Sequence, residues 1–169
     1  MATGLLLVRL VFGLLMAAHG SQKIFGWFGG YGLTGTGTFF EQLGFRPGRL
    51  FAAAAGCTEF LGGVLLAVGL GGPIGPAFIV SVMIVALVSV HRGHGLFAAT
   101  NGIEVPLLYA AGAAALAFTG PGQYSLDALL GVTSMWTTRH AEIALGLAAL
   151  GAIASLTARQ SAVPSRVHA

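Results

Sequence analysis

Five apolar runs, each close to the length of a bilayer-crossing helix, dominate this sequence of 169 residues. A helix needs about 20 mostly apolar residues to cross the hydrocarbon core of a membrane. Charged residues make up only 8% of the chain, against roughly 25% in a soluble domain, so they cannot cover a water-facing surface. The sequence therefore predicts an all-α integral membrane protein. The runs cover about residues 4–26, 49–70, 73–90, 103–119 and 141–158.

The same composition excludes several other classes of protein. A disordered chain would be polar and highly charged, whereas the mean hydropathy here is +0.86. Cys57 is the single cysteine, so the chain cannot form a disulfide scaffold. The net charge of +3 comes from scattered basic residues and does not indicate nucleic-acid binding. No nucleotide-binding or flavin motif is present, and we expect no intrinsic cofactor.

The first four runs predict a four-helix transmembrane bundle. The fifth run is rich in alanine and glycine and is only moderately apolar, so it either crosses the membrane a fifth time or docks against the bundle. We therefore divide the chain into a membrane domain (1–130), an additional C-terminal helix (131–158) and a polar tail (159–169).

Basic residues gather on one side of the membrane if successive helices alternate in direction. The positive-inside rule makes that side cytoplasmic and places the N-terminus outside. The other side carries Arg139 and, near it, Arg9. The side predicted to be cytoplasmic carries Lys23, Arg46, Arg49, Arg92, Arg159 and Arg166.

Two loops carry apolar patterns of their own. Phe39, Phe40 and Leu43 predict a short amphipathic helix at the membrane surface. In the loop after the third run, Leu96 and Phe97 suggest a segment folded partly back against the bundle.

Ionisable residues inside the apolar runs are the candidate functional residues, because such groups are costly in a membrane and usually face the protein interior. Arg9, His19 and Lys23 fall on one sector of the first helix, at 100° per residue. Glu59 lies on a face of the second helix built from small residues, which let another helix approach closely. We therefore expect Glu59 to meet Arg9, His19 or Lys23. This face comprises Ala52, Ala55, Gly56, Glu59, Gly63 and Ala67.

Several strings resemble the motifs of the DoxX family, in the family's order. His19-Gly20-Ser21-Gln22-Lys23-Ile24-Phe25-Gly26 resembles its first-helix motif. Glu59-Phe60-Leu61-Gly62-Gly63 is similar to its second-helix motif. The stretches around Asn101-Gly102-Ile103-Glu104 and Gly122–Asp127 resemble the segments that flank its fourth helix. The resemblance covers about residues 4–130.

The resemblance implies a four-helix membrane bundle and a loose link to redox work, because relatives form a membrane subunit of thiosulfate:quinone oxidoreductases. The leading hypothesis is a quinone-interacting oxidoreductase subunit of a bacterial plasma membrane, with electrons supplied by a soluble redox partner. In it, His19 and Lys23 bind the headgroup, Glu59 handles protons, and His19 and Glu59 form the catalytic pair. The full candidate ligand site is Arg9, His19, Gln22, Lys23, Glu59, His91, Asn101 and Glu104.

Three alternatives stay open. The polar cluster can be an ion-pair network that fixes helix register. The chain can be a non-enzymatic anchor for soluble redox-defence proteins, or, with less support, a small-molecule transporter. We expect no metal site, since His91 and His94 lack a third close ligand. Besides lipid, a homodimer is compatible with the small-residue faces.

Overall fold

The computed structural model describes residues 2–160, and every element in that part of the chain is helical. Five helices are long, and the other elements are shorter helices and single helical turns that connect them. The long helices are α1 (Ala2–Phe25), α3 (Gly48–Val68), α4 (Ile74–Ala86, continued by the π-helical turn η2, Leu87–His91), α5 (Glu104–Thr119) and α7 (Thr138–Thr157). The short elements are η1 (Trp27–Gly29), α2 (Gly32–Gln42), η3 (Ala98–Thr100), α6 (Leu126–Leu129) and η4 (Thr133–Met135).

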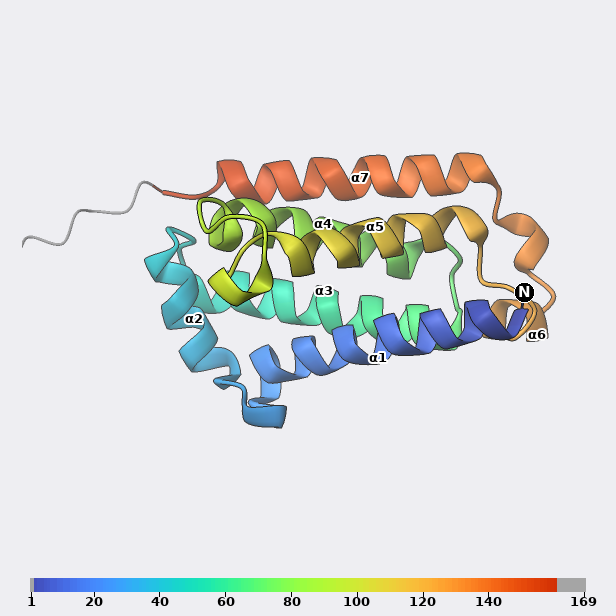
Figure 1. Ribbon diagram of the computed structural model, residues 1–169, viewed down its shortest axis with the longest axis horizontal. Helices are drawn as coiled ribbons and strands as arrows, with labels where there is room; N and C mark the ends of the chain where they lie inside the picture. The colour runs from blue at the N-terminus through green and yellow to red at the C-terminus, as the bar shows by residue number, and fades with distance from the viewer. Residues whose placement is uncertain (1, 161–169) are drawn as a thin grey trace, which may run out of the picture.

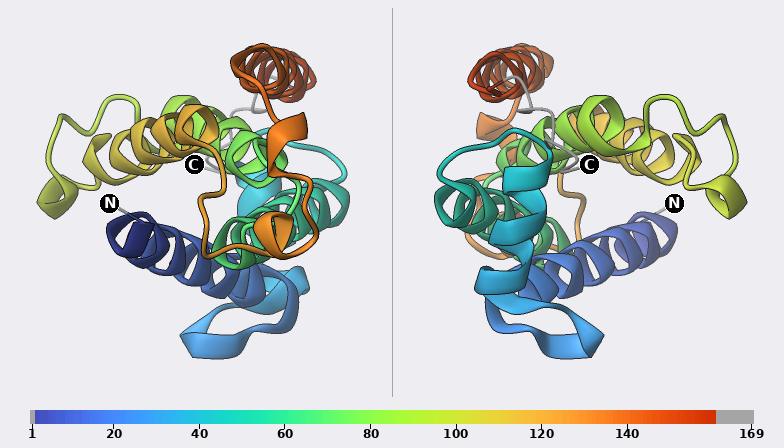
Figure 2. Two further views of the ribbon diagram at one scale, coloured as in Figure 1. Left: turned by 90° about the vertical axis from the view of Figure 1, so that its right-hand side faces the viewer. Right: turned by 90° about the vertical axis from the view of Figure 1, so that its left-hand side faces the viewer.

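The long helices lie along one axis and alternate in direction, while α2 crosses one end of the bundle (Figure 1). α1 packs mainly on α3, and α4 packs on α3, α5 and α7. α7 lies outermost, against α4 (Figure 2). The fifth run is thus a helix that packs lengthwise on α4, and its length and composition are those of a membrane span, in line with the predicted fifth span.

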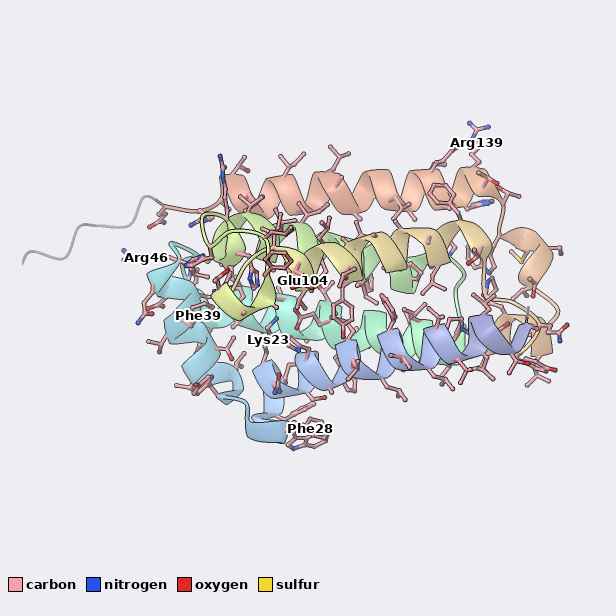
Figure 3. The ribbon with its side chains drawn as sticks, viewed as in Figure 1. Lys23, Phe28, Phe39, Arg46, Glu104 and Arg139 are labelled. Atoms are coloured by element: carbon pink, nitrogen blue, oxygen red, sulfur yellow. The ribbon has the colours of Figure 1, made fainter. Side chains whose placement is uncertain are left out.

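The basic residues are distributed unequally between the two ends of the bundle. We name them the Lys23 end, where α2 and the α4–α5 loop lie, and the Arg9 end, where the α3–α4 turn and α6 lie. Lys23, Arg46 and Glu104 lie toward the first end and Arg139 lies at the second (Figure 3). This separation agrees with the predicted distribution of basic residues. The predicted tail, including Arg166, falls outside the described residues from 161 onward.

Four helices within the described residues are long and apolar enough to cross a membrane. They are α1, α3, α4 with its π-helical turn, and α7, whereas α5 is a shorter apolar helix of 16 residues. The all-α membrane bundle predicted from the sequence is therefore confirmed, and the chain is a multi-pass membrane protein. Its lipid-facing surface is apolar, with many exposed leucine, valine and isoleucine side chains.

α1 and α3 pack backbone against backbone through glycines. A Cβ atom on Gly13 would lie 2.8 Å from the Cα atom of Ala67, and one on Gly20 would lie 2.8 Å from the Cα atom of Phe60. A Cβ atom on Gly63 would lie 2.9 Å from the Cα atom of Ala17. These contacts confirm the predicted small-residue face of α3, because only small residues let two helices approach so closely.

Gly63→Ala is expected to lower the free energy of unfolding by about 1–3 kcal/mol, the usual cost of overpacking, because the new methyl group meets backbone. Gly146 on α7 is a matched control, since a Cβ atom there meets nothing within 4 Å. Gly146→Ala should leave the stability unchanged or raise it by less than about 1 kcal/mol. Unfolding in mixed detergent micelles measures both; equal effects of the two substitutions would contradict the tight α1–α3 contact.

α3 and α4 touch closely near the turn that joins them, and toward their other ends both helices line a cavity. A Cβ atom on Gly75 would lie 2.9 Å from the carbonyl oxygen of Gly62, so the two helices meet there at backbone distance. At the Lys23 end, residues of α3 from Phe51 to Glu59 and residues of α4 and η2 from Ser81 to His91 line the cavity. The helices therefore meet closely at one end and border a cavity at the other.

One of the two loop predictions is confirmed and the other is wrong. The helix predicted around Phe39 is α2. Leu96 and Phe97, however, are 52% and 65% exposed and do not pack on the bundle. The Glu104 carboxylate accepts a hydrogen bond from the amide of Ala98, and such local bonds hold the loop in a compact turn of its own.

Candidate functional site

A cavity of about 790 Å³ lies at the Lys23 end of the bundle, among the first five helices. Its volume lies within the range of roughly 300–1,000 Å³ typical of small-molecule sites. Most of its lining surface is apolar, although many of the lining side chains carry a polar group, and the lining comes from α1 to α5 together with Ser155 of α7. The ionisable or hydroxyl-bearing members discussed below are His19, Lys23, Glu59, His91 and Tyr109.

Glu59 is the deepest charged group of the cavity. Only 1% of its surface is exposed, and its Oε1 atom pairs with the Nζ atom of Lys23. Its Oε2 atom is buried and has no hydrogen-bond partner among the described residues. A buried polar atom normally has a partner, so this oxygen can take one from a ligand or a proton donor. Of the three partners predicted for Glu59, the structure pairs it with Lys23.

His19 and Gln22 share the cavity wall with Lys23 on α1. His19 lies one helical turn before Lys23 and is accessible from the cavity. The side-chain amide of Gln22 donates a hydrogen bond to the carbonyl oxygen of Phe28, at 3.0 Å, and so ties η1 to the end of α1. Among the described residues no hydrogen bond engages the His19 ring, whereas part of the Gln22 amide is engaged.

His91 lies at the rim of the cavity, at the end of the π-helical turn. Its Nδ1 atom lies 2.8 Å from the carbonyl oxygen of Asn101. A carbonyl oxygen only accepts, so Nδ1 carries the proton and a neutral ring leaves Nε2 as an acceptor. Asn101 adopts a left-handed conformation, with φ of 61°, which turns the loop toward η2. π-Helical turns of this kind often occur at functional sites.

Asn101 and Glu104 do not line the cavity. Asn101 positions His91 through its backbone carbonyl, and Glu104 holds the loop through the amide of Ala98, at 2.7 Å. Both residues therefore shape the cavity mouth by fixing the α4–α5 loop, and neither presents its side chain to the interior.

Arg9 lies far from the cavity, at the opposite end of the bundle, and is only 2% exposed. Its Nε and Nη2 atoms donate to the carbonyl oxygens of Leu66 and Ala67, at 3.1 and 3.0 Å. Its Nη1 atom donates to the carbonyl oxygens of Pro121 and Tyr124. We therefore assign Arg9 to the packing of α1 against the end of α3 and the α5–α6 loop.

Sequence reasoning missed the hydroxyl groups of the cavity. Tyr109 on α5 contributes a phenol, and serine and threonine side chains add further hydroxyls. The available signal was a polar residue inside an apolar run, the same signal that selected Glu59. The serine and threonine residues concerned are Thr36, Thr38, Thr58, Ser81, Ser89 and Ser155.

The fold and the cavity define a multi-pass helical membrane protein with a polar cluster enclosed at one end. A family model, DoxX, matches residues 4–92, which is more than half of the chain. The chain belongs to the DoxX family. The matched part runs from α1 to the end of η2 and includes His19, Lys23, Glu59 and His91. No curated protein and no solved structure matches the chain.

Proposed function

We propose that the cavity binds the headgroup of a quinone and that the chain is the membrane subunit of a redox system in a bacterial plasma membrane. One observation carries the proposal. The buried Oε2 atom of Glu59 has no hydrogen-bond partner among the described residues, and Glu59 lines a cavity of ligand size whose lining is mostly apolar. In such a site a small number of polar groups fix the orientation of a polar ring.

The chemistry of the lining fits a quinone ring. Its two carbonyl oxygens need hydrogen-bond donors, which Lys23, the imidazole of His19 and the phenol of Tyr109 can supply. Reduction of a quinone to a quinol takes two electrons and two protons. Glu59 is placed to pass protons to the ring. The electrons would come from a soluble redox protein that binds the chain.

Quinone bound to the purified protein tests the proposal. After purification in mild detergent and solvent extraction, mass spectrometry should find near one quinone per chain. Glu59→Gln should remove most of it, because the amide cannot pair with Lys23 as a carboxylate does. Glu142→Gln, the same chemical change on an exposed position of α7, should leave it unchanged. Equal retention in the two variants, or no more quinone than in an unrelated membrane protein, would refute the proposal.

A second candidate function is a membrane anchor for soluble redox-defence proteins. It is favoured by the basic surface of the Lys23 end, where Arg46, Arg49 and Arg92 are exposed and could attract an acidic partner. This function predicts that reversing the charge of these three arginines abolishes partner binding. It also predicts that Glu59→Gln has no effect on that binding.

A further inference from the structure

Part of the cavity wall lies along the seam between α1 and α5. These two helices flank one side of the bundle (Figure 2), and α1 makes most of its contacts with α3 and few with α5. Every residue of α1 and α5 that lines the cavity belongs to the half of the seam at the Lys23 end. These residues are Met16, His19, Gln22 and Lys23 on α1, and Val105, Pro106 and Tyr109 on α5.

Beyond the cavity, packing of aromatic side chains closes the seam. The rings of Phe12 and Tyr109 meet edge to face, with centroids 5.3 Å apart. Phe12 also rests on Gly112, where a Cβ atom would lie 2.6 Å from the Cζ atom of the ring. Both aromatic residues pack against the hydrophobic core of the bundle. The Phe12–Tyr109 contact therefore marks the boundary between a closed half and a half that borders the cavity.

The surface outside the cavity-bordering half is apolar. Leu15 on α1 and Leu108 on α5 are 53% and 60% exposed, and each lies one helical turn from a residue that lines the cavity. Val105 does both, because it lines the cavity and is 45% exposed. In a membrane protein such a surface faces lipid. A molecule passing this seam would come from the hydrocarbon and would leave its apolar part there.

We propose that the ligand enters from the bilayer between α1 and α5 and keeps an apolar tail in that seam, while its polar ring reaches Lys23 and Glu59. This inference rests on the proposed quinone function and narrows its substrate class. The ligand is a membrane-dissolved quinone with a long apolar tail, and a small water-soluble quinone is a poor ligand.

A bulky side chain at the seam tests this proposal. Val105→Trp places a large ring between the tail and the cavity, and Leu107→Trp is its control, since Leu107 is also 45% exposed but does not line the cavity. Each variant is placed in lipid nanodiscs, and binding of a long-tailed quinone is compared with that of a benzoquinone with the same ring and no tail. Val105→Trp should weaken binding of the tailed quinone about tenfold, equivalent to the contact of roughly two methylene groups, and Leu107→Trp should not. Binding of the tail-less ring should change little in either.

The outcomes separate the seam from the proposed function. If wild type binds the tailed quinone and Val105→Trp binds it equally well, the seam proposal is wrong and the quinone site stands. If binding of both quinones weakens equally, Val105 contacts the ring, and the proposed position of the tail is also wrong. If wild type binds neither quinone, both proposals fail. Should Val105→Trp not fold, Val105→Cys in a Cys57→Ser background can be labelled after folding with a bulky maleimide, with Leu107→Cys as its control.

Discussion

Arg9→Met is expected to be one of the two most destabilising substitutions discussed for the bundle, together with Lys23→Met. The guanidinium group donates to four backbone carbonyl oxygens, two at the end of α3 and two in the loop that follows α5. A hydrogen bond to a charged group contributes about 1.5–3 kcal/mol, although such contributions do not add fully. Loss of all four should lower the free energy of unfolding by about 3 kcal/mol or more.

The loss should be large because Arg9 joins three segments of the chain, α1, the end of α3 and the α5–α6 loop, through one side chain. Asp127 completes the arrangement, since its carboxylate accepts from the amides of Gly71 and Gly72, at 3.0 and 2.7 Å. Methionine matches the length of the arginine stem and keeps its packing, but removes a donor from each of the four carbonyl oxygens, of which that of Leu66 keeps the amide of Gly69. Arg9→Lys should recover only part of the stability, because one ammonium group cannot spread its donors over a planar fork.

Unfolding of the purified protein in mixed micelles measures the effect. Arg139→Met is the control, because Arg139 is an exposed arginine at the same end of the bundle. If the two arginine substitutions have similar effects, the assignment of Arg9 to helix packing is wrong. Quinone bound per folded chain should be unchanged in Arg9→Lys, since Arg9 does not line the cavity.

Arg9 also shows where sequence reasoning reached its limit. Its rotation about the helix axis matches that of Lys23, so periodicity placed the two in one cluster. They are 14 positions apart, which corresponds to a rise of about 21 Å along a helix and separates them by most of the bilayer core. Helical rotation predicts a shared face well, whereas a shared site also needs a shared depth.

The cavity and the loop residues could not be read from the sequence for another reason. The ion pair of Lys23 and Glu59 was predictable, because two opposite charges inside apolar runs have few other partners. The cavity depends on how the helices that line it are spaced beyond the Gly62–Gly75 contact. The sequence pattern of a single helix does not determine that spacing. The role of Glu104 depends likewise on the path of the α4–α5 loop, which periodicity does not describe.

Removal of Lys23 alone should cost more stability than removal of the whole ion pair. Lys23→Met leaves the buried Glu59 carboxylate without its counter-charge, and breaking a buried pair in this way costs about 3–5 kcal/mol. Lys23→Met combined with Glu59→Gln also removes the unpaired negative charge of the Glu59 carboxylate. The double variant should therefore unfold at a higher temperature than Lys23→Met, with a coupling energy of about 0.5–3 kcal/mol.

The same pair of variants separates a structural ion pair from a ligand site. If the pair only fixes the register of α1 against α3, the stable double variant should keep whatever the cavity binds. If the pair orients a quinone, the double variant should regain its stability and still lack the bound quinone, because both the ammonium donor and the carboxylate are gone. Stability and quinone content measured on one preparation give the two answers together. A double variant less stable than Lys23→Met would show that the Glu59 carboxylate has a partner other than Lys23.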